Sequence, residues 1–213
     1  MIILLFGAPG SGKGTQSVYL KDWLGYRAVS TGELLRAEAS SGSKLGQELA
    51  AVLAAGQYAD DDLVNRIVEN QLDRLNGSGL ILDGYPRTVQ QAQFLDLALR
   101  SRELRRPSVI HLDVPCEVLV ERLSSRWSCP RCGRAFSLLQ QKPKIAGVCD
   151  GCGCKLLRRA DDEPDVIGSR LEAYHRLTGS VLDHYRNGQY LRVDGNQPPE
   201  DVFGVIQSVL GSH

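Results

Sequence analysis

The sequence has no excess of charge of either sign: among its 213 residues, 25 lysines and arginines balance 25 aspartates and glutamates. A balanced chain has no overall field that would attract nucleic acid or an anionic membrane. Any anion must therefore be bound by a local cluster of cations. We expect neither nucleic acid nor a membrane among the partners of this protein.

Long apolar runs are also missing. No segment approaches the roughly 18 apolar residues needed to cross a bilayer, and the opening run from Met1 to Phe6 has neither a basic leader nor a small-residue cleavage site. These features lead us to expect a cytoplasmic protein. Internal repeats and low-complexity stretches are absent as well, and an apolar content of 42% is enough for a substantial core.

Short apolar runs alternate with helical patterns along the chain. The runs at 2–6, 80–82, 109–114 and 190–193 are typical of strands, and a helix is expected from about Gly14 to Trp23. This alternation predicts an α/β fold of three layers, in which helices cover both faces of a mostly parallel central sheet and ligands bind at the carboxyl ends of the strands. Two stretches, 30–59 and 125–162, break the alternation, and we interpret both as insertions on one core.

A glycine-rich segment from Gly7 to Thr15 joins the first apolar run to the first expected helix, which is the context of a phosphate-binding loop. Glycines allow successive backbone N–H groups to face one anion, and the helix N-terminus adds the positive end of its dipole. Lys13 would supply a mobile charge to the β- and γ-phosphates. The strict pattern has Ser or Thr directly after this lysine, whereas here Gly14 precedes Thr15. The alternative interpretation is a glycine-rich turn with a surface lysine.

The second apolar run ends in the segment Asp83-Gly84-Tyr85-Pro86-Arg87. A carboxylate at a strand end beside a phosphate loop can hold waters of Mg2+, which usually keeps much of its hydration. Arg87 is then positioned to grip an anion. Taken alone, such a segment is more typical of a simple turn. Together with the phosphate loop it predicts a second anion site.

Four of the six cysteines form two C-x-x-C pairs, Cys129 with Cys132 and Cys149 with Cys152, separated by the 16 residues from 133 to 148. This spacing is close to that of zinc ribbons. Four thiolates leave no open position on Zn2+, so the metal should be structural, substituting for a core that a short insertion cannot bury. Cys154 competes as a ligand, and we favour Cys152 because it completes the pair. A redox dithiol or free thiols are the alternative to a metal.

These motifs, together with Ser30-Thr31-Gly32, Arg36 and the segment from Arg158 to Asp162, resemble the adenylate kinase family over essentially the whole chain. The resemblance implies a P-loop core at 1–29, 60–124 and 163–213, an AMP-binding arm at 30–59 and a zinc-binding lid at 125–162. It also implies reversible, Mg2+-dependent phosphoryl transfer between ATP and AMP that gives two ADP, with the lid closing over both nucleotides. We further expect a monomer.

The resemblance also implies roles for single positions. ATP and its Mg2+ would be bound by Gly10, Ser11, Gly12, Lys13, Gly14, Thr15, Arg122, Phe136 and Gln197. AMP would be bound by Thr31, Arg36, Gln57, Ala59, Gly84, Arg87, Gln91, Arg159 and Arg170, with Gln91 reading the adenine. The transition state would be stabilised by Lys13, Arg87, Arg122, Arg126, Arg159 and Arg170. Tyr58 stands where the family pattern has a smaller aliphatic residue, and Ser137 stands where many relatives have histidine.

Other functions remain open from the sequence alone. The nearest is another nucleoside monophosphate kinase, with GTP as donor or UMP or CMP as acceptor. A GTPase-type switch would carry an N-K-x-D motif, which is absent, and a nucleic-acid-binding ribbon would need a basic surface. His111 is expected to be a satisfied core group. The acidic segment 161–163 is expected to be a solvated hinge or a salt-bridge segment without a chemical task, and its aspartates could also pair with lid arginines on closure.

Overall fold

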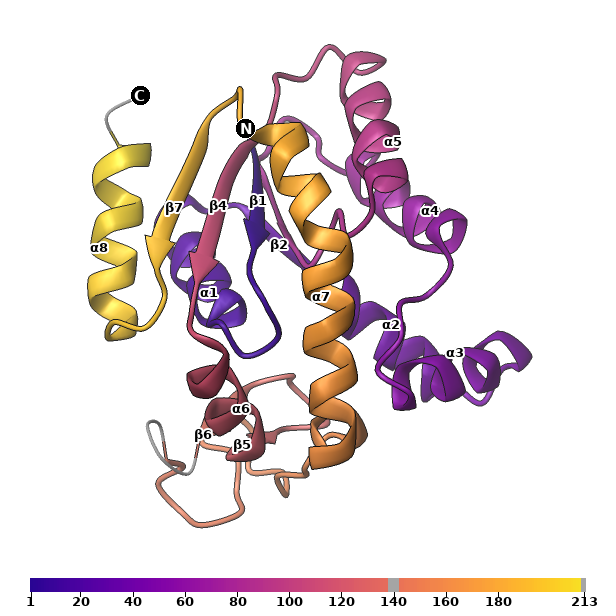
Figure 1. The fold of residues 1–213 in the computed structure, drawn as a ribbon, viewed down its shortest axis with the longest axis vertical. Coiled ribbons are helices and arrows are strands. Elements are labelled where there is room, and N and C mark those ends of the chain that lie inside the picture. The colour runs from indigo at the N-terminus through magenta and orange to yellow at the C-terminus, as the bar shows by residue number, and fades with distance from the viewer. Residues whose placement is uncertain (138–141, 212–213) are drawn as a thin grey trace.

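The computed structural model describes residues 1–137 and 142–211. Its centre is a five-stranded parallel sheet with helices on both faces (Figure 1), so the three-layer α/β fold expected from the sequence is confirmed. In spatial order the strands are β2 (Arg27–Ser30), β3 (Leu80–Asp83), β1 (Ile2–Phe6), β4 (Ser108–Asp113) and β7 (Tyr190–Asp194).

Strand β1 shows why both faces of the sheet are buried. Ile2 and Leu4 pack in one core cluster, whereas Ile3 and Leu5 pack in another, because successive side chains of a strand point to opposite faces. The first cluster is covered by α4 (Asp61–Leu72), α5 (Val89–Arg100) and α7 (Pro164–Tyr185). The second is covered by α1 (Lys13–Leu24) and α8 (Pro199–Leu210).

Strand β2 is the one strand of the central sheet that the sequence patterns did not predict. It lies at the sheet edge and pairs with β3 alone, with the register Arg27 to Leu80 through Ser30 to Asp83. Only Val29 of its four residues is buried, so the segment contains no apolar run that would have indicated a strand.

The two insertions lie at the carboxyl end of the sheet, where the strand arrows point (Figure 1). The first contains α2 (Thr31–Ala39) and α3 (Lys44–Ala54). The second follows α6 (Cys116–Ser124) and contains the antiparallel strands β5 (Arg126–Ser128) and β6 (Ala135–Ser137) and the 3-10 helix η1 (Ala160–Asp162).

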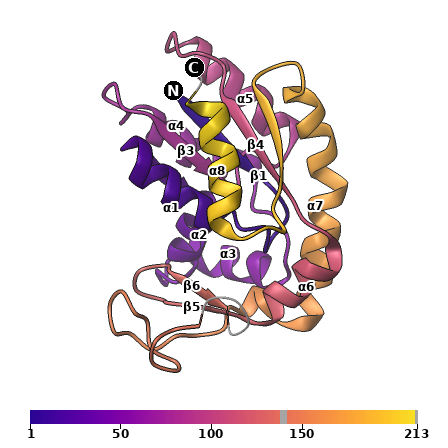
Figure 2. The same cartoon turned by 90° about the vertical axis from the view of Figure 1, so that its left-hand side faces the viewer.

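The insertions touch each other, as Figure 2 shows for β5 and β6 below α2 and α3. A β-carbon built on Gly133 would lie 3.1 Å from Oε1 of Glu33. Residues of both insertions therefore enclose the end of the sheet from which the phosphate loop emerges. In the part of the chain that is described, no helix has the length and apolar character needed to span a membrane.

Candidate active site

The loop between β1 and α1 depends on glycine at its turns. A β-carbon on Gly7 would lie 2.3 Å from Ser11 Oγ and 2.8 Å from the carbonyl oxygen of Leu112, so only glycine allows this close approach. Gly12, with a φ of +98°, is the N-cap of α1 and provides no side-chain cap. The N–H groups of the first helical turn are thus left for an anion, at the positive end of the helix. This loop carries the predicted phosphate-binding residues Gly10, Ser11, Gly12, Lys13, Gly14 and Thr15.

Lys13 and Asp83 face this loop from two sides. The Lys13 Nζ donates hydrogen bonds to the carbonyl oxygens of Gly7 at 2.8 Å and Ala8 at 2.9 Å. The Asp83 Oδ2 would lie 4.0 Å from a β-carbon built on Gly14. A carboxylate oxygen therefore lies beside the start of α1, and oxygen is the ligand that Mg2+ or its waters prefer. The donor set at this position fits the expected cation.

Arginines from separate parts of the chain converge near Lys13. Burial lowers the pKa of Lys13 to about 8; Asp83 opposes this shift, and the charges of three nearby arginines add to it. Burial likewise lowers the pKa of Arg159 to about 10, with like charges adding to the shift. Like charges held together out of water favour binding of a polyanion, which relieves their repulsion. The converging arginines are Arg36, Arg87, Arg126, Arg159 and Arg170.

Part of this positive charge is balanced by Asp162, which is completely buried. Its carboxylate accepts hydrogen bonds from Arg126 Nε and from Arg170 Nη1, each at 2.7 Å. Burial alone would raise the pKa of Asp162, but the hydrogen bond and charge of Arg126 and the charge of Arg170 lower it overall. The expectation of a solvated hinge is therefore wrong for Asp162, and the expectation of pairing with a lid arginine is confirmed. Asp161 pairs with Arg170 at 3.1 Å.

Arg122 lies apart from the other arginines. Its Nη1 donates to the carbonyl oxygen of Gly195 at 3.0 Å, and its Nη2 lies 3.5 Å from Asn196 Oδ1. Its Nε is buried without a hydrogen-bond partner among the described residues. The next residue, Gln197, donates from Nε2 to Asp194 Oδ2 at 2.8 Å. The structure thus brings Arg122 to the turn between β7 and α8, beside Gln197, so that two residues expected to bind ATP lie together.

Arg87 organises the second anion site. Its Nε donates to the Gly84 carbonyl oxygen at 2.8 Å, and its backbone N–H donates to Gln91 Oε1 at 2.7 Å. The ring of Tyr58 lies against the guanidinium, with Arg87 Cζ 4.7 Å from the ring centroid. The hydroxyl of Thr31, which is buried, donates to the Gly84 carbonyl oxygen at 3.0 Å. These contacts therefore hold the Arg87 side chain in a defined orientation.

Gln91 is held by protein partners on both sides of its amide. It is 2% exposed; besides accepting from Arg87, it donates from Nε2 to Asp61 Oδ1 at 2.7 Å. Asp61 also accepts from the Thr88 hydroxyl at 2.6 Å. An amide has two donor hydrogens and two lone pairs on its oxygen, so Gln91 keeps one of each for a ligand. Asp61 was missed in the sequence, where it resembles an ordinary acidic residue at a helix start.

Three further predicted contacts differ in their surroundings. Gln57 and Ala59 flank Tyr58 in the loop between α3 and α4. Because Tyr58 lies against Arg87, this loop is part of the second anion site. Phe136 is buried inside the lid beside Cys129, Cys149 and Leu156. The ring of Phe136 therefore belongs to the lid core, and any contact with a nucleotide would have to come from its backbone.

The four predicted metal ligands meet in the lid. The Sγ atoms of Cys129, Cys132, Cys149 and Cys152 all lie within 4.8 Å of one another. A tetrahedral Zn2+ with Zn–S bonds of about 2.3 Å would separate its sulfurs by about 3.8 Å. The distances are 3.3 Å from Cys129 to Cys152, 3.5 Å from Cys132 to Cys149 and 3.7 Å from Cys152 to Cys132. The donor set fits a structural zinc ion.

Two matching turns explain why Cys154 is not part of this cluster. The N–H of Cys129 donates to the Arg134 carbonyl at 2.9 Å, and the N–H of Cys149 donates to the Cys154 carbonyl at 2.8 Å. In each turn the glycine before that carbonyl, Gly133 or Gly153, has a φ of +72°. Cys154 thus occupies the place that Arg134 has in the first turn. The sulfur cluster contains Cys152, as preferred from the spacing, and its role as a metal ligand stays a prediction.

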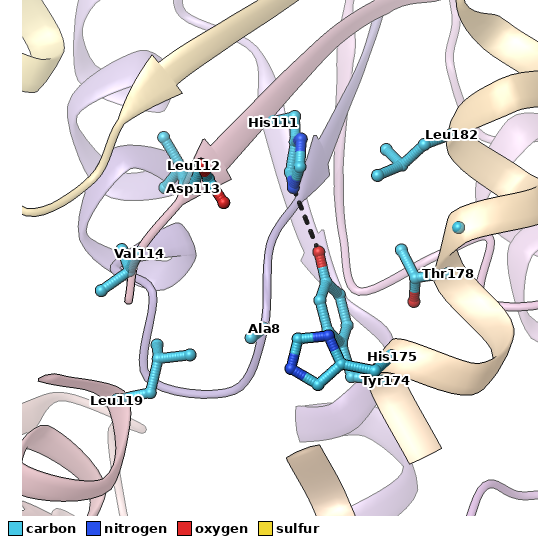
Figure 3. A pocket seen from close by; sticks show the side chains of 11 residues that line it. Ala8, His111, Leu112, Asp113, Val114, Leu119, Tyr174, His175, Thr178 and Leu182 are labelled. Carbon is cyan, nitrogen blue, oxygen red and sulfur yellow. Dashed lines mark hydrogen bonds between the residues drawn. The ribbon is translucent and has the colours of Figure 1, made fainter. Parts of the chain in front are cut away.

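His111 lies beside the phosphate loop, in a cavity of about 180 Å³ between β4 and α7 that Ala8 also lines (Figure 3). Its Nε2 lies 3.2 Å from the Tyr174 hydroxyl and its Nδ1 lies 2.8 Å from the Tyr190 hydroxyl. Burial lowers the pKa of His111. Because both ring nitrogens have partners, the expectation of a satisfied internal histidine is confirmed.

Comparison with known proteins agrees with this arrangement. Residues 5–190 match the family model described as adenylate kinase. A curated adenylate kinase from Anaeromyxobacter dehalogenans is 40% identical over 213 residues, covering 99% of this chain and 100% of the relative. Adenylate kinases from Paramagnetospirillum magneticum and Petrotoga mobilis are 39% and 38% identical, covering 99% and 100% of this chain and 98% of each relative. Since these matches run through the phosphate loop, both insertions and the arginine cluster, the chain belongs to the adenylate kinase family.

Proposed function

We propose that this chain transfers the γ-phosphoryl group of ATP to AMP, reversibly, giving two ADP. The observation that carries the proposal is a cluster of cations at the glycine-lined loop: three arginines act on Lys13, and two more lie beside these. Phosphoryl transfer spreads negative charge over the transferred oxygens and asks the protein mainly for positioning and electrostatic stabilisation. The acceptor oxygen of AMP is already ionised at neutral pH, so a general base is not required.

On the donor side, the backbone N–H groups of residues 10–15 and the ammonium of Lys13 bind the β- and γ-phosphates. Gln197 meets the base of ATP, and Arg122 binds ATP and stabilises the transition state when the lid closes. The hydrogen bond of Arg122 to Gly195 supports a place for Arg122 on the donor side. Asp83 would hold the waters of Mg2+, whose charge neutralises the donor phosphates when the ion is bound. This assignment is supported by the position of the Asp83 carboxylate beside the start of α1.

On the acceptor side, Arg36 and Arg87 bind the phosphate of AMP, and Gln91 reads the adenine with its remaining amide hydrogen and lone pair. The nucleoside is surrounded by the arm and the Gly84 turn, through Thr31, Gln57, Ala59 and Gly84. The transferred group is stabilised from the lid and α7 by Arg126, Arg159 and Arg170. These roles are supported by the mutual proximity of the arginines and their orientation by buried partners.

We propose that the arm at 30–59 and the lid at 125–162 close over both nucleotides while the core at 1–29, 60–124 and 163–213 stays in place. The contact of Glu33 with Gly133 supports a closed arrangement of arm and lid. Closure excludes water, which would otherwise take the phosphoryl group. It also brings Arg126 and Asp162 of the lid to Arg170 of α7, and hence brings Arg126 to the phosphates.

Zn2+ is proposed as the ion of the cysteine cluster, with Cys129, Cys132, Cys149 and Cys152 as ligands. Four sulfurs fill a tetrahedral shell, so the ion shapes the lid and does not contact substrate. We also propose a cytoplasmic monomer. None of the six cysteines forms a disulfide bond in the described structure, which fits a reducing compartment.

A substrate panel tests the proposal directly. The purified protein would be incubated with ATP, Mg2+ and AMP, GMP, CMP or UMP, and ADP formation would be followed by chromatography. AMP is expected to give the highest kcat/KM. The Arg87→Ala variant is expected to lose about 100-fold or more in kcat/KM for AMP while its circular dichroism spectrum stays unchanged. A preference for another monophosphate, or a near-normal Arg87→Ala, would refute the acceptor assignment.

A further inference from the structure

Tyr58 has a defined partner at the acceptor site. The Arg87 Cζ lies 4.7 Å from the centroid of the Tyr58 ring, within the roughly 6 Å over which a guanidinium is attracted to an aromatic face. Both side chains are half-buried, so water screens the contact only in part. An aliphatic side chain at this position could pack against Arg87 but could not provide this electrostatic attraction.

The backbone on both sides of Tyr58 is held in place. Gly56 has a φ of +69°, and a β-carbon there would lie 2.8 Å from Arg170 Cγ, so the turn after α3 packs closely against α7. Two residues beyond Tyr58, Asp60 caps α4 by accepting a hydrogen bond from the Asp62 N–H at 3.0 Å. The ring is therefore carried by a short segment that is anchored at each end.

A group that stabilises the Arg87 guanidinium should leave its terminal N–H groups available for a ligand. Its surroundings are cationic, since its charge acts on Lys13 together with those of Arg126 and Arg170. Its Nε is already bonded to the Gly84 carbonyl, and within the described residues its two terminal nitrogens have no protein acceptor. A carboxylate would offset the repulsion but would compete with an incoming phosphate. An aromatic ring attracts the flat face of the cation and leaves the in-plane N–H groups free.

We propose that Tyr58 is a positioning residue for AMP, whose ring holds the Arg87 guanidinium in place so that its terminal nitrogens are presented to the acceptor phosphate. The inference rests on the proposed role of Arg87 as a ligand of that phosphate. A preoriented guanidinium can bind phosphate in a bidentate manner without first losing side-chain freedom. The ring should therefore strengthen AMP binding and leave ATP binding unaffected.

Tyr58 also acts electrostatically on Tyr174 of α7, whose hydroxyl lies beside His111 (Figure 3). Burial raises the pKa of Tyr174, and nearby Tyr58 adds to this shift. A role through the hydroxyl would thus act on α7, whereas a role through the ring acts on Arg87. Replacing Tyr58 by phenylalanine or by leucine separates the two.

The test measures AMP binding by calorimetry and the KM values for both nucleotides. Tyr58→Leu keeps an apolar side chain but removes the aromatic face, and its Kd and KM for AMP are expected to rise about three- to tenfold. Its KM for ATP is expected to change by less than about twofold, because the lost contact with Arg87 weakens binding of AMP and not of ATP. Tyr58→Phe keeps the ring and is expected to retain the wild-type affinity for AMP. In an Arg87→Ala background, Tyr58→Leu is expected to have no further effect on the Kd for AMP.

Equal AMP affinity in Tyr58→Leu and the wild type would overturn the inference. So would an equal loss in Tyr58→Leu and Tyr58→Phe, because the ring persists in the second variant, and so would a parallel loss of ATP affinity. A normal AMP affinity in Arg87→Ala alone would instead overturn the proposed role of Arg87. The two failures are therefore distinguishable.

Discussion

Asp162 and Arg126 form an ion pair in the protein interior: Asp162 Oδ2 accepts a hydrogen bond from Arg126 Nε at 2.7 Å, and the aspartate is completely buried. Arg170 bonds to the same carboxylate. Arg126 belongs to β5 of the lid and Arg170 to α7 of the core, so one buried anion connects the two parts. The position of the lid arginine therefore depends on a residue that has no reason to contact substrate.

Removing the charge of Asp162 should affect both stability and catalysis. In Asp162→Asn, two partly buried arginines lose their shared, completely buried counter-ion, and the free energy of unfolding is expected to fall by about 3 kcal/mol or more. We expect kcat to fall at least about tenfold as well, because Arg126 is no longer held toward the phosphates. Urea unfolding and steady-state kinetics would measure the two effects.

Asp183→Asn is the matched control, since Asp183 pairs with Arg186 at 3.1 Å on the surface, where the two side chains are 66% and 67% exposed. Ion pairs that are screened by water contribute little to stability, so the free energy of unfolding of Asp183→Asn is expected to change by no more than about 0.5 kcal/mol. If both variants lost the same stability and kept the same activity, the special position of Asp162 would be disproved.

The pH profile should report on Lys13. Because burial lowers its pKa from 10.5 to about 8, the free enzyme loses this positive charge as the pH rises through about 8. The kcat/KM for ATP is therefore expected to decline on the alkaline side. Stability should change in the opposite direction: between pH 8 and 10.5 the unfolded chain binds more protons at Lys13 than the folded chain, so this group contributes stability that increases with pH.

Lys13→Arg tests the origin of the alkaline decline, because arginine keeps its charge throughout this pH range. The rates of Lys13→Arg are compared with one another across pH and not with those of the wild type. Its profile is expected to be flat from pH 7 to about 9, below the pKa of Arg159 at about 10. An identical decline in Lys13→Arg would show that another group is responsible.

Loss of the lid metal should be traceable to particular cysteines. Cys149→Ser is expected to abolish stoichiometric zinc, measured by atomic emission, and to lower the melting temperature more than it lowers the rate at moderate temperature. Chelation of the wild type should do the same. Cys154→Ser is the control and is expected to retain zinc, because its carbonyl closes the second turn while its sulfur lies outside the cluster. Catalysis abolished in a zinc-free but folded protein would contradict a purely structural role.

Asp61, the hydrogen-bond partner of Gln91, should affect how strongly the enzyme prefers the adenine base of AMP. Asp61→Ala leaves Gln91 Nε2 without its hydrogen bond at 2.7 Å, so the amide is free to rotate, and KM for AMP is expected to rise about three- to tenfold. The preference for AMP over GMP should fall as well. Asp62→Ala removes an acid from the same first turn of α4 but is exposed, and it is expected to leave both quantities unchanged. Equal effects in the two variants would point to the helix start and not to Gln91.

Much of the fold and of the site could be predicted because its signals are local in the chain. The apolar runs of β1, β3 and β4 are buried along most of their length, so consecutive apolar residues indicate these strands. The run of β7 also indicates a strand, although only Val193 of it is buried. The phosphate loop requires glycine at turns that few other residues tolerate, and the metal ligands recur at short, regular spacing. Strand β2 could not be found in this way, because an edge strand needs little apolar surface.

The long-range partners were decided only by the tertiary structure. A sequence does not distinguish Asp162, buried between two arginines, from its exposed neighbour Glu163. Nor does it show that Arg122 bonds to the turn before α8, that Asp61 orients Gln91, or that Tyr58 lies against Arg87. The backbone conformations and metal spacing follow from neighbouring residues, whereas the balance of buried charge follows from groups brought together across the whole chain. Whether an ionised side chain is solvated or paired depends on that packing.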